Sequence, residues 1–222
     1  FETVLRSPNF TEPKTGFRSA ADVPSFIDYM LLNELLENAD ALFSSTYILL
    51  NEAGKIKMGP VWDFNLGIGN NARSKFPVDK LYMQKKYWAG RMLKDPEFLK
   101  QYEARWAELR TTVFNIAHIH ALIENWAGQL QEAQKRNFGR WRLLGVDKHP
   151  SSAHGKSYRS EVDFLKERLV KRIAFLDNEF GFEVSPITII NEIGFNERGE
   201  AVYIELYNPS FKNISLDGYT IS

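Results

Sequence analysis

The chain has 222 residues, of which 44% are hydrophobic and 14% aromatic, so it can bury a sizeable core in one domain and part of another. Its 28 basic and 28 acidic residues cancel, which gives no overall attraction to nucleic acid or to anionic lipid. Cysteine is absent, so disulfides and thiolate zinc sites are excluded, and no apolar run approaches the roughly 18 residues of a membrane span.

The first part of the chain contains one strongly patterned helix. Residues 1–21 are polar and are predicted to form a loop. Asp22 followed by Pro24 is typical of a helix start, because the carboxylate accepts from free N–H groups and proline fits the first turn. Apolar residues at helical spacing then predict a helix that ends near Asn38. They are Phe26, Ile27, Met30, Leu31, Leu35 and Leu36.

A β-hairpin is predicted next. Residues 46–50 and 55–58 are rich in strand-forming side chains. The turn 51–54 between them ends in Gly54, which supplies the positive φ that a tight hairpin turn needs. We therefore expect the chain to leave and return at the same end of this hairpin.

Residues 77–181 are predicted to be mostly helical. Residues 95–97, Asp-Pro-Glu, start one helix, and residues 116–138 are expected to form a single long one. Residues 158–180 form a further helix that Gly181 ends. The apolar face of that helix consists of Val162, Leu165, Leu169, Ile173 and Leu176.

The composition changes after the linker at 184–186. Residues 202–207 alternate apolar and polar side chains, as a half-buried strand does, and residues 214–219 indicate another strand with a turn. A β-sandwich needs about 100 residues. Residues 187–222 are therefore expected to be the opening of a β-domain that continues beyond this chain.

The candidate chemistry lies on either side of the hairpin. Asp40 follows the first helix and Asp63 follows the second strand, so both carboxylates should lie at the same end of the hairpin. Asp63 and Asn65 offer hard oxygen ligands, which suit magnesium or manganese better than zinc. Protein kinases place one aspartate near the accepting hydroxyl and another on the metal after a short hairpin. The layout is therefore kinase-like.

Simpler explanations compete with this one. An aspartate after a strand often only caps a turn or pairs with a basic side chain, and Asp40 could serve only to end its helix. His118 and His120 lie on opposite faces of a predicted helix, so they cannot share one metal. Residues 135–142, KRNFGRWR, would suit phosphate or an acidic peptide. We favour the alternative for this segment, a solvated helix end whose aromatic side chains pack inward.

Residues 22–70 resemble the central block of the CotH kinase family, in which a helix ending in asparagine and aspartate precedes a hairpin and a Trp-Asp-Phe motif. Residues 157–180 resemble that family's closing helix, and the resemblance covers about residues 1–181. It implies an atypical protein kinase that uses ATP with Mg²⁺ or Mn²⁺ to phosphorylate a protein substrate. The implied fold is α+β: a mostly helical, remote kinase-like C-terminal lobe with a β-hairpin.

The resemblance also implies roles for individual residues. Asp40 would be the catalytic aspartate, Asp63 and Asn65 would bind the metal, and Asn38 and Ser45 would support the nucleotide or the metal. Asn65 stands where many members have a second aspartate, and Ser45 where some have asparagine. These departures motivate the alternative of a non-catalytic pseudokinase that serves as a surface scaffold or adhesion protein. A metal-dependent hydrolase that uses the same carboxylates is a third possibility.

Two further expectations concern domain organisation. Residues 1–183 would be a CotH kinase-like domain whose nucleotide-binding lobe precedes residue 1, because nothing before Asp22 supplies the expected strands and lysine. Residues 187–222 resemble the start of a lamin-tail domain, an immunoglobulin-like β-sandwich, on the segments INEI, IELYNP and LDGY. That domain usually accompanies secreted or surface enzymes of bacteria, so the resemblance implies an extracellular or cell-surface location.

Overall fold

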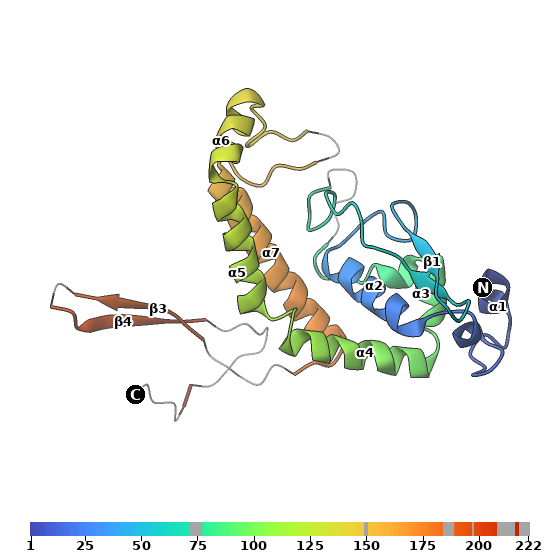
Figure 1. Cartoon of the computed structure of the whole chain (residues 1–222). Coiled ribbons are helices and arrows are strands. Elements are labelled where there is room, and N and C mark those ends of the chain that lie inside the picture. Colours follow the sequence, from blue (N-terminus) through green and yellow to red (C-terminus); the bar gives the residue numbers. More distant parts are fainter. Residues whose placement is uncertain (72–76, 149–150, 184–188, 197, 208–215, 218–222) are drawn as a thin grey trace.

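The computed structural model describes residues 1–71, 77–148, 151–183, 189–196, 198–207 and 216–217 (Figure 1). The helices are α1 (Glu2–Arg6), α2 (Val23–Leu35), α3 (Tyr87–Met92), α4 (Pro96–Thr111), α5 (Ile116–Gln129), α6 (Gln131–Arg140) and α7 (Tyr158–Glu179), with short 3-10 helices η1 (Phe17–Ser19) and η2 (Met83–Lys85). The strands are β1 (Ile48–Leu50), β2 (Ile56–Met58), β3 (Ile189–Phe195) and β4 (Ala201–Tyr207), in two separate antiparallel pairs. The predicted α+β class is confirmed. No helix in the described part is both long and apolar enough to cross a membrane.

Helix α2 is the central element of the core. It begins where the sequence predicts, since the Asp22 carboxylate accepts a hydrogen bond from the Ser25 N–H at 3.3 Å. The helix packs against α4, α7 and β2 and is buried on most of its surface. It ends at Leu35 rather than near Asn38, because Glu37 adopts a left-handed backbone conformation with φ of 51°.

The β1–β2 hairpin has the predicted turn and shorter strands than predicted. Ile48 pairs with Met58 and Leu50 with Ile56, and Gly54 has φ of 71°. Met58 is buried against α2, whereas the side chains of β1 are exposed. Strand β1 starts at Ile48 because the Thr46 hydroxyl is engaged locally, accepting from the Leu42 N–H and donating to a backbone carbonyl.

Residues 1–21 are not the solvated loop that the sequence predicts. They form α1 and η1, and Leu5, Phe10 and Phe17 are buried in the core. Phe17 packs edge-on against Phe98 of α4, with ring centroids 5.9 Å apart. The prediction is wrong because these apolar side chains are too widely spaced to show a period, and long-range packing orders the segment instead.

Helices α5, α6 and α7 form a helical arm in which α5 and α7 lie side by side and α6 forms the far end (Figure 1). Helix α7 and its glycine stop are as predicted, with Gly181 at φ of 64°. The single helix predicted over 116–138 is wrong, because the chain breaks at Leu130 between α5 and α6. At this break the Ala127 carbonyl accepts from the Tyr158 hydroxyl at 3.2 Å and from the Gln131 side chain at 3.4 Å.

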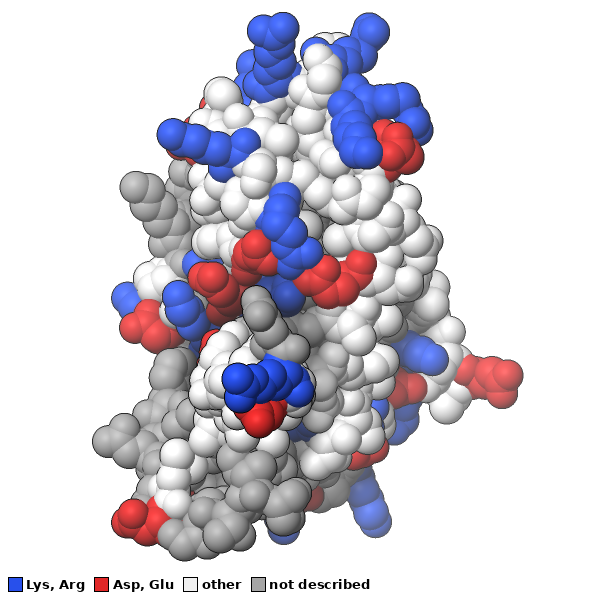
Figure 2. All heavy atoms as spheres, turned by 90° about the vertical axis from the view of Figure 1, so that its left-hand side faces the viewer, with Lys and Arg blue, Asp and Glu red and all other residues white. Residues whose placement is uncertain are grey.

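The end of the helical arm is basic. Figure 2 shows Lys and Arg side chains gathered at the upper end of the molecule, which α6 forms. Phe138 is half-buried and lies 6.4 Å from Tyr158 between ring centroids. Trp141 is 55% exposed, with Arg140 over its ring, so the expectation that both aromatics of 135–142 pack inward is wrong for Trp141.

Strands β3 and β4 form a hairpin, and the strand predicted over residues 202–207 is present as part of β4 but is not half-buried. Val202 and Leu206 are exposed, as is Tyr203 on the alternate face. The linker at 184–186 and most of 214–219 lie outside the described residues. Assignment of this hairpin to a lamin-tail domain therefore stays a prediction.

Candidate functional site

The Asp40 turn, residues 38–45, follows α2, and hydrogen bonds of the buried Asn38 side chain fix its first residues. Asn38 is buried, and its side-chain amide donates to the Asn33 side chain at 2.8 Å. The Asn38 side-chain oxygen accepts from the Asp40 N–H at 3.1 Å. The Asp40 carbonyl in turn accepts from the Ser44 N–H at 2.9 Å. Asn38 therefore fixes the backbone of Asp40, while the Asp40 side chain is half-buried.

Asp63 is exposed and lies in the site loop, residues 59–70, which follows β2. Its carboxylate accepts a hydrogen bond from the Ser45 hydroxyl at 3.3 Å, which joins the site loop to the Asp40 turn. The two segments therefore meet at the open end of the hairpin, whereas the expected closeness of the Asp40 and Asp63 carboxylates stays a prediction. Asp63 has no ion-pair partner among the residues that the structure describes. Its carboxylate oxygens keep acceptor capacity for a cation or a donor.

Backbone strain is concentrated at this place. In the described part of the chain, the non-glycine residues with positive φ all lie between residues 37 and 68. They are Glu37, Leu42, Ser45, Asp63 and Ile68. Such conformations cost about 1–3 kcal/mol each and occur preferentially at functional sites. The strain includes Ser45 and Asp63, the two residues whose side chains meet.

The site loop is bound to the end of α2. The Ile68 N–H donates to the Leu36 carbonyl at 2.8 Å. A Cβ on Gly67 would lie 2.5 Å from the same carbonyl oxygen, so the loop can approach α2 only with glycine there. Asn70 closes the loop, since its side-chain amide donates to the Asn65 carbonyl at 2.8 Å.

Helix α7 holds the end of α2 with two arginines. Arg168 donates twice to the Glu37 carboxylate, at 2.6 and 2.8 Å. Arg172, 1% exposed at its side chain, donates to the Glu34 carboxylate at 2.5 Å and to the carbonyls of Val78 and Lys80. Burial raises the pKa of Glu34, and the Arg172 charge opposes that rise. These buried ion pairs join α7 to the end of α2 and form the floor of the site.

Lys86 is a site residue that sequence reasoning missed. Its ammonium group donates to the Ala39 carbonyl at 2.9 Å, immediately before Asp40 in the chain. Burial lowers the pKa of Lys86, and the neighbouring Asp40 carboxylate raises it in part. No local pattern connects Lys86 to Asp40, because only the packing of η2, which precedes Lys86, against α2 brings them together.

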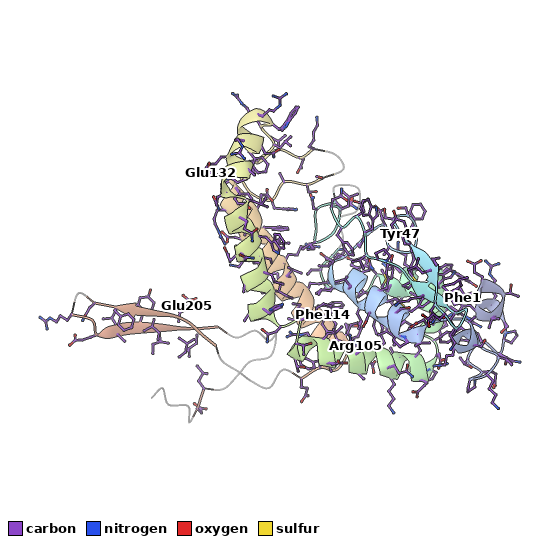
Figure 3. All side chains as sticks on the ribbon, in the orientation of Figure 1. Phe1, Tyr47, Arg105, Phe114, Glu132 and Glu205 are labelled. Atoms are coloured by element: carbon purple, nitrogen blue, oxygen red, sulfur yellow. The ribbon has the colours of Figure 1, made fainter. Side chains whose placement is uncertain are left out.

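Apolar side chains surround the open end of the hairpin. Phe43 is 85% exposed and Trp62 is 57% exposed. The rings of Trp62 and Tyr47 meet edge-on with centroids 6.4 Å apart, and Figure 3 shows Tyr47 beside β1. The candidate acids therefore lie between a buried ionic floor and an apolar, exposed rim.

The donor set fits a divalent cation that arrives with phosphates. Asp63, Asn65 and Ser45 are hard oxygen donors, and Asn65 is exposed like Asp63. Among the described residues, no group of three or more His, Cys, Asp or Glu side chains lies close enough together to hold a metal alone. Magnesium commonly takes one or two protein carboxylates and completes its shell with water and substrate phosphates. The residues present match that pattern.

The two histidines singled out in the sequence are not part of this arrangement. His118 is exposed on α5, whereas His120 is half-buried with its Nε2 atom lacking a hydrogen bond among the described residues. Burial, helped by the Lys166 charge, lowers the pKa of His120.

Comparison with known proteins bears on the family alone. A search of the curated proteins finds no match to this chain. The family model described as CotH kinase protein matches residues 1–176, which include the Asp40 turn, the site loop and most of α7. The resemblance on residues 22–70 is thereby confirmed, and the chain belongs to the CotH kinase protein family.

Proposed function

We propose that this chain is the catalytic part of an atypical protein kinase that transfers the γ-phosphate of ATP to serine or threonine hydroxyls of a protein. The observation that carries the proposal is the Ser45–Asp63 hydrogen bond, which brings the Asp40 turn and the site loop together in a chain of this family. Kinases need an aspartate near the acceptor hydroxyl and a second one on the metal. Asp40 and Asp63 supply that pair.

Asp40 serves the acceptor. Its backbone is fixed by Asn38 from below and its carbonyl is engaged by the turn, so the half-buried carboxylate has a defined position. The acceptor oxygen bonds to the γ-phosphorus while the bond from that phosphorus to the ADP oxygen breaks. The hydroxyl proton passes to the Asp40 carboxylate, which returns it to solvent.

Asp63 and Asn65 would hold the divalent cation, Mg²⁺ or Mn²⁺. When bound, the cation supplies charge neutralisation on the β- and γ-phosphate oxygens. Ser45 orients the Asp63 carboxylate through its hydrogen bond. Because Asn65 contributes no formal charge, we expect tight metal binding only in the presence of ATP.

The test uses the protein in its full natural length. It is incubated with ATP and Mg²⁺ or Mn²⁺ and weighed intact, beside Asp40→Asn, Asp63→Asn and the control Asp79→Asn, an exposed aspartate outside both segments. We expect a gain of about 80 Da for each phosphate and a loss of transfer of about 1,000-fold in each site variant, since metal and base are each worth several kcal/mol. The control should keep full transfer.

Three outcomes would overturn the proposal. Unchanged transfer in Asp63→Asn would remove the metal assignment. Loss of ATP without phosphate on any protein would instead indicate a metal-dependent hydrolase. ATP binding with neither reaction, over a panel of acceptor proteins, would indicate a pseudokinase scaffold.

A further inference from the structure

Asn70, the last residue of the site loop, uses both ends of its side-chain amide. The amide nitrogen donates to the Asn65 carbonyl at 2.8 Å, within the loop. The amide oxygen accepts from the Ser152 N–H at 3.0 Å, from a residue 82 positions further along the chain. A backbone carbonyl can only accept and a backbone N–H can only donate, so these two partners fix the orientation of the amide. Aspartate could not donate to the Asn65 carbonyl, and an apolar side chain could bond to neither partner.

Ser152 lies in the arm segment, residues 151–155, which is itself attached to α7. The arm segment belongs to the connection between α6 and α7, which extends from the helical arm toward the site loop (Figure 1). The Glu161 carboxylate, in the first turn of α7, accepts from the His154 N–H at 2.9 Å and from the Gly155 N–H at 2.8 Å. Helix α7 therefore holds this segment in place.

The site loop and the arm segment line a cleft of about 490 Å³. Asn65 and Asn70 line it from the site loop, and Ser152 and His154 line it from the arm segment. Because side chains leave this space open, the two segments do not pack closely along its length. The hydrogen bond between Asn70 and Ser152 is therefore a direct link between the two walls of the cleft.

The two candidate metal ligands are thus held from different sides. Asp63 is joined to the Asp40 turn by the Ser45 hydroxyl. Asn65 is exposed, and its backbone carbonyl is held by Asn70. The position of Asn65 depends on α7 through the arm segment, whereas that of Asp63 depends on the hairpin.

We propose that Asn70 is a positioning residue of the metal site, which fixes Asn65 by joining the site loop to the arm segment and so to α7. The effect on the metal rests on the proposed function, whereas the link between the two segments does not. Loss of Asn70 affects one of the two candidate ligands and leaves Asp40 unchanged. It should therefore weaken metal binding without slowing phosphate transfer once the metal is saturating.

The test is Mn²⁺ binding to the protein in its full natural length, with a saturating ATP analogue that cannot be hydrolysed. Electron paramagnetic resonance measures free Mn²⁺ and needs no phosphate transfer. Residues that orient metal ligands typically contribute 10- to 100-fold to affinity, so Asn70→Ala should weaken Mn²⁺ binding about tenfold. The Mn²⁺ concentration for half-maximal transfer from ATP should rise equally, with kcat at saturating Mn²⁺ within about twofold of the unchanged protein. Asn137→Ala, at an exposed asparagine of α6, is the matched control and should change none of these values.

A double variant tests whether Asn70 acts through the arm segment. Glu161→Ala removes the acceptor of the His154 and Gly155 N–H groups and leaves the site loop unchanged. It should weaken Mn²⁺ binding about threefold, and residues that act through one chain of contacts give non-additive effects. Asn70→Ala combined with Glu161→Ala should therefore bind Mn²⁺ about as weakly as Asn70→Ala alone. Circular dichroism checks that each variant keeps its helices.

Either of two results would overturn the inference: unchanged Mn²⁺ affinity in Asn70→Ala, or additive losses in the double variant. The two proposals fail separately. Unchanged affinity in Asn70→Ala, beside lost transfer in Asp63→Asn, would remove the positioning role and leave the kinase. Weakened, non-additive Mn²⁺ binding in a protein that transfers no phosphate would remove the kinase and leave the positioning role. Absence of Mn²⁺ binding in the unchanged protein would remove both.

Discussion

The two halves of α7 use arginine in opposite ways. Arg172, near the base of the helical arm, is buried and donates to Glu34 and to backbone carbonyls beneath the site. Arg159, in the first turn, is 53% exposed and pairs with Glu124 and Asp163. The nitrogen–oxygen distances in the ion pairs of Arg172 and Arg159 are similar. What each arginine contributes to stability therefore depends on its burial and on how many buried polar groups it hydrogen-bonds. The base is a buried, fully hydrogen-bonded support beneath the Asp40 turn, and the arm is a surface whose charges remain available to solvent.

Removing the buried arginine is the change with the largest expected effect. Arg172→Met leaves the Glu34 carboxylate buried without its counter-charge and takes the donors from the carbonyls of Val78 and Lys80. We expect the free energy of unfolding to fall by about 3–5 kcal/mol, measured by urea denaturation. Adding Glu34→Gln should restore part of that loss, because the uncompensated charge is removed. A loss below about 1 kcal/mol in Arg172→Met would show that the base does not depend on this pair.

Lys86 is intermediate in burial between Arg172 and Arg159, and it lies beside the Asp40 turn. Its replacement should therefore have an intermediate effect. Lys86→Met should lower kcat for phosphate transfer about tenfold, or about 1.4 kcal/mol, with KM for ATP unchanged. The reason is that Asp40 loses the contact that holds the preceding carbonyl. Lys86→Arg should recover most of the rate.

The pH profile separates positioning by the Lys86 charge from simple packing. Burial lowers the pKa of Lys86, so its charge is lost at a lower pH than that of an ordinary lysine. The rate of the unchanged protein should therefore fall on the alkaline side, and that fall should be missing in Lys86→Met. The same alkaline fall in both proteins would exclude this role.

The exposed network of the arm carries the smallest expected effect. The pKa of Glu124 is lowered to about 2, first by hydrogen bonds from Arg159 and Lys166. A carboxyl group whose folded-state pKa is lowered stabilises the protein above its unfolded pKa, and that contribution disappears as pH falls through the folded value. Glu124→Gln should therefore reduce the free energy of unfolding by less than about 1 kcal/mol at pH 7, after solvent screening.

The difference between Glu124→Gln and the unchanged protein should shrink as the pH falls from about 4.5 to about 2. Thermal unfolding followed by circular dichroism over this range measures it. The pH dependence expected for Glu34 has the opposite sign. Burial raises its pKa, so its contribution to the free energy of unfolding increases as pH falls. A difference that stays constant down to pH 2 would contradict the assigned network.

Much of the candidate site was predictable from the sequence, because its signals are local. The capping aspartates, the Gly54 turn and the spacing of the α7 face each depend on residues within a few positions of one another. The meeting of Ser45 and Asp63 follows from the same locality, since a short hairpin must return the chain to its starting point. Family membership was likewise readable from the block around these residues.

Tertiary structure alone decided the features that depend on distant partners. The order of residues 1–21, the break at Leu130 and the position of Lys86 beside Asp40 each result from contacts with elements far along the chain. The cleft likewise forms only when the site loop meets the helical arm. The sequence by itself therefore determined which residues are candidates for the chemistry and how the hairpin joins their segments. Long-range burial determined what supports Asp40 and what surface lies beside it, because local spacing contains no information about packing partners.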